Sequence, residues 1–137
     1  MSVLFGEEHV ERYLATNGEE GHRWLKDSTV LLLTTTGRKT GKESTTPLIY
    51  DLDGEDTVIV ASKGGSPEHP GWYKNLSKNP EVGVQIKADR FRARARTVED
   101  GPERDRLWEK MTRMWPSYDK YQAQTDRQIP VVVLERV

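Results

Sequence analysis

Short apolar or β-branched segments, separated by turn residues, run through most of this sequence. Residues 29–36 are almost continuously apolar or β-branched, and residues 82–86 alternate as a strand with one buried face does. Asp53-Gly54 and Ala88-Asp89 are turn signals that return the chain as hairpins. Pro47 cannot donate a ladder hydrogen bond, so it predicts an edge strand or a bulge. About six strands are predicted: residues 29–36, 44–52, 57–61, 82–86, 90–96 and 129–135.

Helix signals occur between these strands but do not alternate with them regularly. Residues 3–14 fit a helical apolar stripe only loosely, Pro70 suits the first turn of a second helix, and Gly101-Pro102 opens the clearest helix. Pro116 ends or kinks that helix, and residues 118–125 add one or two turns. Because a doubly wound sheet needs regular alternation, we predict a mostly β, α+β fold: a small antiparallel barrel with helices packed outside.

Length and composition exclude several classes of protein. The 137 residues predict a single domain, 1–137, in which 1–28 form an N-terminal helical extension. The sequence has no cysteine, which excludes disulfides and thiol chemistry. A formal net charge of -1 gives no overall attraction to nucleic acid or anionic membrane. No signal peptide or membrane-spanning run is visible, so a cytoplasmic protein is expected.

The side chains that usually bind metals or carry catalysis form no recognisable pattern. His9, His22 and His69 are scattered without metal-ligand spacing, so no metal site is predicted. No nucleophile elbow occurs, and no nucleophile and base are paired in sequence. If the chain is an enzyme, we therefore expect a bound organic cofactor to supply the chemistry.

A basic, glycine-containing segment, residues 37–42 (the basic loop), follows the first predicted strand. It is one residue shorter than a nucleotide-binding P-loop, Glu43 stands where that motif has Ser or Thr, and a strand follows it instead of a helix. Nucleoside triphosphate binding is therefore not predicted. Two interpretations remain: a solvated basic turn, or a loop whose N–H groups and cations hold a phosphate or carboxylate.

Four arginines alternate with apolar residues between Arg90 and Arg96. A charged outer strand face, paired with the acids of residues 99–109, is one interpretation, and a nucleic-acid surface is the other. Because Phe91 faces away from the arginines, base stacking beside them is not supported, and no nucleic acid partner is predicted.

Aromatic residues gather around Pro116. Trp108 precedes it on the helical apolar stripe and is expected in the core. Trp115, Tyr118 and Tyr121 lie at the helix break among polar residues. Either the wall of a pocket or ordinary partial burial fits these three.

Five motifs in order along the chain carry a resemblance to a known family. They are TTTGRKTGK, VIVASKGGSPEHPGWYKNL, NPEVGVQIK, MWPSYDKYQ and TDRQIPVVVLE. Together they resemble the deazaflavin-dependent nitroreductase family, over about residues 31–135. Members use coenzyme F420 and adopt the split β-barrel of flavin-reductase-like proteins. The resemblance therefore implies a split β-barrel of about six antiparallel strands with flanking helices, and an F420-dependent reductase.

The resemblance also assigns residues to the cofactor and to the substrate. F420 carries a phosphodiester and an oligoglutamate tail, and in the family the basic loop holds the phosphate region. Carried over, the cofactor-binding residues are Thr34, Arg38, Lys39, Thr40, Gly41, Lys42, Leu48, Ile49, Tyr50, Val60, Ala61, Ser62 and Lys63. The catalytic residues on the substrate side are Ser62, Trp115, Tyr118 and Tyr121. The best-known nitroreductase branch has tyrosine in place of Ile49 and Trp115.

The activity implied is hydride transfer from F420H2 to an electrophilic acceptor. A quinone is the first acceptor class, with nitroaromatics and unsaturated lactones as alternatives. Ser62 or Tyr118 is expected to donate a hydrogen bond to negative charge on the acceptor. An FMN-dependent reductase and a non-catalytic F420 carrier are the alternative functions.

The resemblance leaves the partners less defined. A monomer and a homodimer both fit it, and peripheral membrane association through a quinone substrate is left open. Residues 1–14 are expected to close the pocket, because Glu7, Glu8 and Glu11 would repel anionic lipid.

Overall fold

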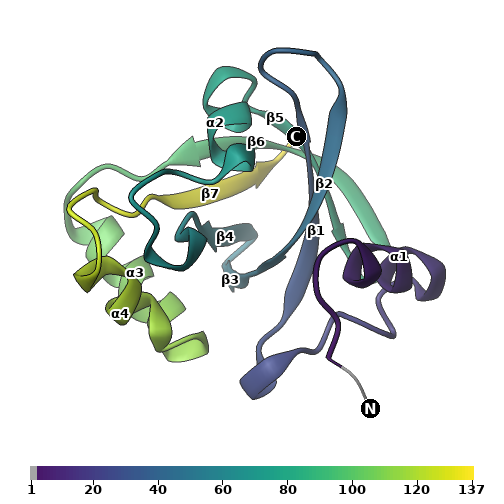
Figure 1. Cartoon of the computed structure of the whole chain (residues 1–137), viewed down its shortest axis with the longest axis horizontal. Helices are drawn as coiled ribbons and strands as arrows, with labels where there is room; N and C mark the ends of the chain where they lie inside the picture. The colour runs from purple at the N-terminus through teal and green to yellow at the C-terminus, as the bar shows by residue number, and fades with distance from the viewer. Residues whose placement is uncertain (1–2) are drawn as a thin grey trace.

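The fold is built on one curled antiparallel sheet, seen in a computed structural model that describes residues 3–137 (Figure 1). Within these residues, seven strands follow the order β2-β1-β5-β6-β7-β4-β3. The strands are β1 (Val30–Thr36), β2 (Glu43–Ile49), β3 (Asp51–Asp53), β4 (Asp56–Val60), β5 (Glu81–Ile86), β6 (Asp89–Thr97) and β7 (Val131–Arg136). The hairpin predicted at Asp53-Gly54 joins β3 to β4, where Gly54 has a φ of 63°.

The predicted strand 44–52 is two strands, which is why six predicted strands become seven. β2 pairs with β1 as far as Ile49, and β3 pairs with β4 from Asp51. Between them the Tyr50 N–H donates to the Thr29 carbonyl at 3.0 Å, and the Thr29 hydroxyl donates to the Tyr50 carbonyl at 3.0 Å. β2 and β3 are the two edges of the sheet, yet one residue joins them. The sheet must therefore curl until its edges approach each other, which gives the predicted split barrel.

The sheet buries apolar side chains on both of its faces. One core fills the inside of the curl and includes Leu31, Leu33, Ile59, Val82, Val84, Val132 and Leu134. The second core lies outside it, under the C-terminal helices, and includes Val58, Val60, Leu107, Met111, Tyr118, Ile129, Val131 and Val133. β4 and β7 contribute to both cores, so their sequences are apolar without alternation.

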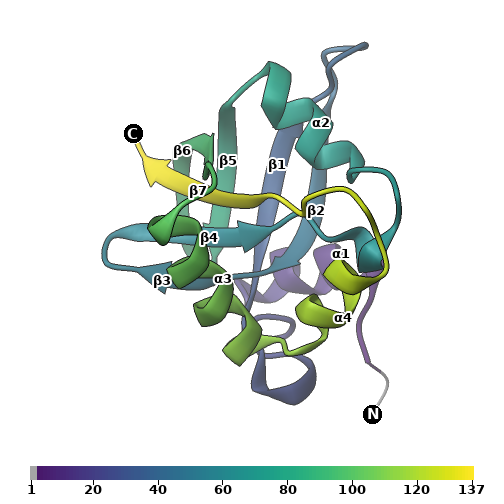
Figure 2. The ribbon, with the colours of Figure 1, turned by 90° about the vertical axis from the view of Figure 1, so that its left-hand side faces the viewer.

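Four α-helices in the described residues cover the sheet. α1 (Gly6–Thr16) packs near β2, α2 (Gly71–Lys78) packs on β1, and α3 (Pro102–Met114) packs on β4 and β7 (Figures 1 and 2). α4 (Ser117–Ala123) follows α3 across Pro116, as predicted, and contacts the short helix η2 (Lys63–Gly65). A second short helix, η1 (Leu25–Asp27), precedes β1. None of the helices in residues 3–137 combines the length and apolarity needed to cross a bilayer.

Two of the four arginines on β6, Arg92 and Arg96, make ion pairs. Arg96 makes a bidentate pair with Glu103 of α3, both hydrogen bonds at 3.0 Å, as predicted for the acids of residues 99–109. Arg92 pairs instead with Glu81 of the neighbouring strand, at 3.8 Å. These contacts favour the structural interpretation of the arginines.

Candidate functional site

A cleft of about 420 Å³ opens where the end of β2, the turn after β4, the start of α2 and the helix α4 meet. The sequence predicted residues from three separate segments, and the structure brings them together here. The predicted residues in its lining are Leu48, Ile49, Val60, Ser62, Lys63, Trp115, Tyr118 and Tyr121. The lining residues that were not predicted are Trp24, Pro47, Gly64, Pro70, Gly71 and Trp72.

The turn of residues 62–65, called the cleft turn below, has an unusual backbone. Lys63, Gly64 and Gly65 take left-handed conformations with φ of 45°, 62° and 84°. Glycine adopts this region freely, whereas a residue with a side chain does not. At Gly65 a Cβ would also lie 2.8 Å from the carbonyl oxygen of Tyr121. The two glycines therefore let the turn pass close to α4 and line the cleft with backbone.

Tyr118 belongs to both the core and the cleft. Its ring packs with Leu107 and Met111, and the residue is only 4 % exposed. Every fully enclosed polar side-chain atom in residues 3–137 has a hydrogen-bond partner, and none is found for the Tyr118 hydroxyl. Since Tyr118 also lines the cleft, the cleft is the place where this oxygen can meet a ligand. Burial raises the pKa of the phenol well above its ordinary value, so the hydroxyl is a neutral donor in the physiological range.

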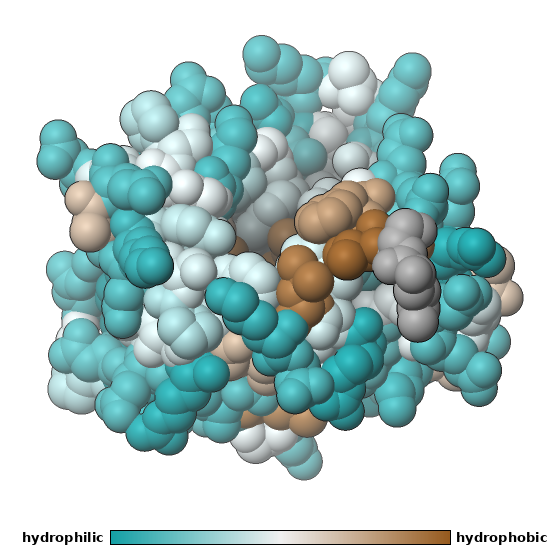
Figure 3. Space-filling model, turned by 60° about the horizontal axis from the view of Figure 1, so that its bottom comes forward, coloured by the Kyte–Doolittle hydropathy of each residue, from teal (hydrophilic) through white to brown (hydrophobic). Residues whose placement is uncertain are grey.

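The N-terminal segment contributes a tryptophan that the sequence analysis missed. Trp24 stacks on Trp115, with 5.7 Å between ring centroids and 19° between planes. Its indole N–H donates to the Leu4 carbonyl at 2.9 Å, and the ring of Phe5 meets it edge-on at 5.5 Å. In Figure 3, apolar residues gather on the face that carries this N-terminal part of the chain. An isolated tryptophan in a charged segment was the only signal in the sequence.

The basic loop lies outside the cleft lining, against α2. Its main chain is closed by a hydrogen bond from the Gly37 N–H to the Lys42 carbonyl, at 2.7 Å. The Asn75 Oδ1 accepts from the Arg38 N–H at 3.2 Å and from the Arg38 guanidinium at 2.9 Å. The Lys78 ammonium donates to the Arg38 carbonyl at 3.2 Å. Asn75 and Lys78, which were not predicted, therefore anchor the loop.

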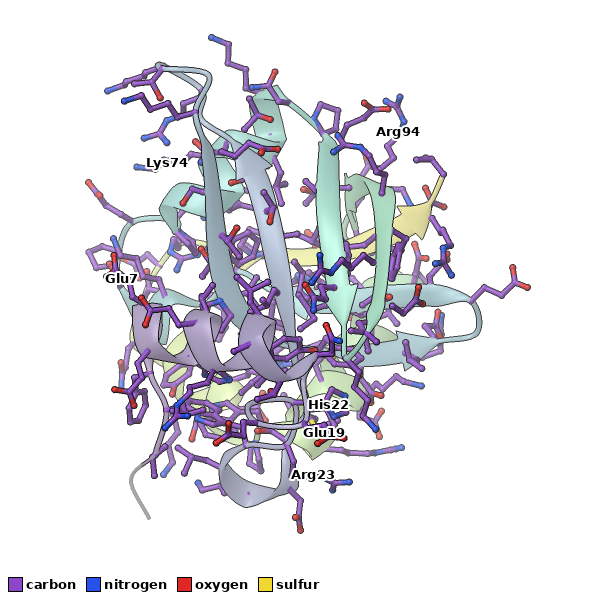
Figure 4. The ribbon with its side chains drawn as sticks, turned by 90° about the vertical axis from the view of Figure 1, so that its right-hand side faces the viewer. Glu7, Glu19, His22, Arg23, Lys74 and Arg94 are labelled. Carbon is purple, nitrogen blue, oxygen red and sulfur yellow. The ribbon has the colours of Figure 1, made fainter. Side chains whose placement is uncertain are left out.

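The remaining members of the basic loop present charge to solvent. Lys39 and Lys42 are exposed, as are Thr40 and Gly41. Lys74 of α2 adds a further cation on this side of the molecule (Figure 4). The loop, together with α2, thus forms a cationic surface.

Besides the five predicted residues of the basic loop, three further predicted cofactor residues do not line the cleft. The Thr34 and Thr45 hydroxyls are 2.8 Å apart and line a shallow hollow on a different part of the sheet. The Tyr50 hydroxyl lies 2.8 Å from the His22 Nε2, and burial raises the pKa of that phenol to about 12. Ala61 is completely buried. A role of these three residues in cofactor binding therefore stays a prediction.

Helix α2 connects the cleft to the basic loop. Gly71 and Trp72 line the cleft at its first turn, whereas Asn75 and Lys78 hold the loop at its last turn. Seven residues of helix span about 10 Å. A ligand with a flat apolar ring in the cleft could run an anionic chain along α2 to the cations of the basic loop. Coenzyme F420 has such a ring and chain, so the residues present fit it. Among residues 3–137 no group of three metal-binding side chains is found.

The fold is a curled split barrel, with a cleft that suits a flat ring and a cationic surface that suits an anionic chain attached to that ring. This combination is typical of a class of cofactor-dependent reductases. The sequence profile of the F420H(2)-dependent quinone reductase family matches residues 5–136. The chain therefore belongs to this family.

Individual relatives agree with this assignment. An F420H(2)-dependent quinone reductase of Mycobacterium tuberculosis is 45 % identical over 130 residues, 93 % of this chain and 87 % of the relative. A solved F420-H2 dependent reductase, FDR-A, is 42 % identical with a TM-score of 0.71, covering 77 % of this chain and 93 % of its own. A structure described as a domain-swapped dimer is 40 % identical with a TM-score of 0.74, covering 93 % and 95 %.

The comparisons confirm several expectations from the sequence. The chain is an F420-dependent oxidoreductase of the split-barrel fold, F420H2 is the reductant, and a quinone is the acceptor class. The alternatives of an FMN enzyme and of a non-catalytic carrier receive no support from them.

Proposed function

We propose that quinone reduction by F420H2 takes place in this cleft, whose lining is divided between cofactor and acceptor. Leu48, Ile49 and Val60 offer an apolar wall, and the backbone of the cleft turn offers polar groups beside it. This combination suits a deazaflavin ring, and the basic loop suits its anionic chain. When bound, reduced F420 supplies a hydride, which with one proton converts a quinone to its quinol.

The acceptor lies against the aromatic side of the cleft in this proposal. Trp115 and Tyr121 are half-buried there and present flat surfaces. The Tyr118 hydroxyl donates to the quinone oxygen on which negative charge develops, and the Ser62 hydroxyl is the second candidate donor. Both act by stabilising charge that is larger in the transition state than in the bound quinone.

One observation carries the assignment of Tyr118. Tyr118 lines the cleft, and no hydrogen bond of its hydroxyl is found within residues 3–137, while its ring is held in a packed core. A donor fixed in this way needs no reorganisation when the acceptor becomes charged. A purely structural tyrosine with 4 % exposure would direct its hydroxyl to a protein acceptor instead.

The proposal also covers the range of acceptors and the oligomeric state. The aromatic wall suits flat acceptors in general, so nitroaromatics and unsaturated lactones are secondary substrates. Replacement of two tyrosines of the nitroreductase branch by Ile49 and Trp115 leaves the cleft with fewer donors. A relative forms a domain-swapped dimer, and a monomer and a homodimer both fit this chain.

Removing only the phenol oxygen tests the proposal. Tyr118→Phe should lower kcat/KM for a water-soluble quinone about tenfold, the effect of one lost hydrogen bond of about 1.4 kcal/mol. Titration should show F420 affinity changed less than about twofold. Single-turnover oxidation of F420H2, followed by stopped flow, measures the chemical step.

Tyr73→Phe is the matched control, because the Tyr73 hydroxyl bonds Thr97 at 2.9 Å and lines no part of the cleft. It should leave the rate unchanged. If Tyr118→Phe also leaves the rate unchanged, Tyr118 has no catalytic role. Ser62→Ala then decides whether the serine is the donor.

A further inference from the structure

The guanidinium of Arg127 is held by four acceptors. Its Nε donates to the Ser66 carbonyl at 2.8 Å, and one Nη to the Ser62 carbonyl at 2.7 Å. The other Nη lies 3.2 Å from the Ala61 carbonyl and 3.1 Å from the His69 Nδ1. Three partners are main-chain carbonyls and the fourth is an imidazole nitrogen, and no carboxylate within residues 3–137 pairs with this arginine.

These acceptors belong to both walls of the cleft. Ala61, Ser62 and Ser66 begin and end the segment that carries the cleft turn. His69 immediately precedes Pro70, Gly71 and Trp72, which line the opposite wall at the start of α2. One side chain therefore ties the two walls together from outside the cleft.

The cleft turn needs such support because its own backbone bonds are few. Within it, the Gly65 N–H donates to the Ser62 carbonyl at 3.0 Å and the Ser66 N–H donates to the Lys63 carbonyl at 3.1 Å. Lys63, with φ of 45°, occupies a conformation that a side chain disfavours. Without an external constraint the turn would relax toward other conformations.

His69 must be neutral for its Nδ1 to accept from a cation. Burial, the charge of Arg127 and the charge of Lys74 lower the pKa of His69. The ring of Tyr73, 4.9 Å from the imidazole, covers it from α2, and Glu68 precedes it in the same loop. The neutral form therefore persists below the ordinary histidine range.

We propose that Arg127 is a positioning residue that fixes the cleft turn and the start of α2, and thereby the site of Ser62 and of the backbone that faces the cofactor. Arg127 lines no part of the cleft, so it acts through these groups and not on the reacting atoms. The proposal rests on the function proposed for the cleft. Its first test is independent of that function, because it uses the protein without cofactor or quinone.

The first test is amide hydrogen exchange in the Arg127→Ala and Arg127→Lys variants. The Gly65 and Ser66 amides should exchange at least about tenfold faster in both variants, because a lysine ammonium cannot replace a planar fork with several donors. Amides of β5 should keep their rates. Arg106→Ala is the control, since Arg106 makes a bidentate pair with Asp53 at 2.7 and 3.1 Å, away from the cleft.

The second test asks whether the loosened turn affects the site. Both variants should weaken F420 binding by about tenfold in a direct titration, and added guanidinium ion at non-denaturing concentration should partly restore Arg127→Ala. Unchanged exchange at Gly65 and Ser66 would overturn the proposal, as would equal acceleration in β5, which indicates a general loss of stability. Faster exchange in the turn with unchanged F420 affinity would overturn the link to the cofactor. If Arg127→Ala does not fold, Arg127→Lys is judged by the same criteria.

Discussion

Trp24 and Trp115 stack on each other in the lining of the cleft, with their ring planes 19° apart. The first residue precedes β1 and the second ends α3, so the pair connects the N-terminal segment to the aromatic side of the site. The Lys26 ammonium lies 5.3 Å from the Trp115 ring centroid and adds a second contact between the two segments. The N-terminal segment is therefore part of the cleft wall.

Trp24→Ala should raise KM for the quinone several-fold while leaving the protein folded, because an aromatic pair contributes about 0.5–1.5 kcal/mol beyond its buried area. Trp24→Phe should recover most of the loss. Steady-state kinetics with urea unfolding as the stability check measure both effects. Leu52→Ala is the control, since Leu52 is 49 % exposed and lines no part of the cleft. A KM that does not move would show that residues before β1 do not close the cleft.

The basic loop should determine affinity for the anionic chain of F420. Lys39→Ala with Lys42→Ala removes two exposed cations without breaking the closing bond of the loop, which is made by main-chain groups. The dissociation constant for F420 should rise at least about tenfold, since each charge-assisted contact contributes about 1–3 kcal/mol. Added salt should weaken F420 binding to the wild-type protein, and it should weaken binding to the double variant less.

Arg90→Ala with Arg94→Ala makes the same change in net charge on β6, and Figure 4 shows Arg94 apart from Lys74 and α2. That control should bind F420 normally. Equal losses of F420 affinity in the two double variants would mean that only the overall charge of the protein matters. No loss in either would make the basic loop a solvated turn.

The sequence predicted the elements well where one local signal decided them. Pro70, Pro116 and Asp53-Gly54 act through backbone geometry, and each lies at the boundary it predicted. The break at Tyr50 was missed because it depends on Thr29, whose main chain and hydroxyl bond Tyr50 at the end of the β1–β2 ladder. Such long-range contacts leave no mark in the local pattern.

The candidate site shows the same division. Ser62, Trp115 and Tyr118 were predicted from the family motifs, and all three line the cleft. Trp24 and Arg127 act through stacking and hydrogen bonds with distant segments, so neither spacing nor residue type indicated their roles. Thr34 was predicted because it lies within the motif that contains the basic loop. Its side chain lines a hollow other than the cleft.

Gly65→Ala should disrupt the site more than Gly64→Ala. Both glycines have positive φ, so both substitutions introduce backbone strain of about 1 kcal/mol. Only at Gly65 does the new Cβ meet other atoms, 2.8 Å from the Tyr121 carbonyl oxygen, whereas at Gly64 nothing lies within 4 Å. Gly65→Ala must therefore shift the cleft turn or α4, and either shift disturbs the cleft, which both elements line.

Urea unfolding should show a larger loss of stability for Gly65→Ala, and the rate of quinone reduction should fall with it. Gly64→Ala introduces backbone strain without a steric collision, so it separates the two effects. Equal losses of stability in the two variants would contradict the close approach of the cleft turn to α4.

Stability should fall as the pH is lowered below about 6.5, because His22 and His69 are neutral in the folded protein. Burial and the charges of Lys87 and Arg23 lower the pKa of His22, whose Nε2 lies 2.8 Å from the Tyr50 hydroxyl. The pKa of His69 is lowered as well. The unfolded chain takes up protons near the ordinary value of 6.5, whereas the folded protein does so only at lower pH.

The stabilisation is therefore complete above about pH 6.5 and is lost progressively as the pH falls toward the lowered values. Urea midpoints between pH 7.5 and 5 should show this decline. His22→Gln with His69→Gln should flatten it, because glutamine offers hydrogen bonds but does not titrate. Asp53 and Glu103, whose pKa values are lowered from 3.8 and 4.5 by Arg106 and Arg96, act below this window. An equally steep decline in the double variant would assign the pH dependence to other groups.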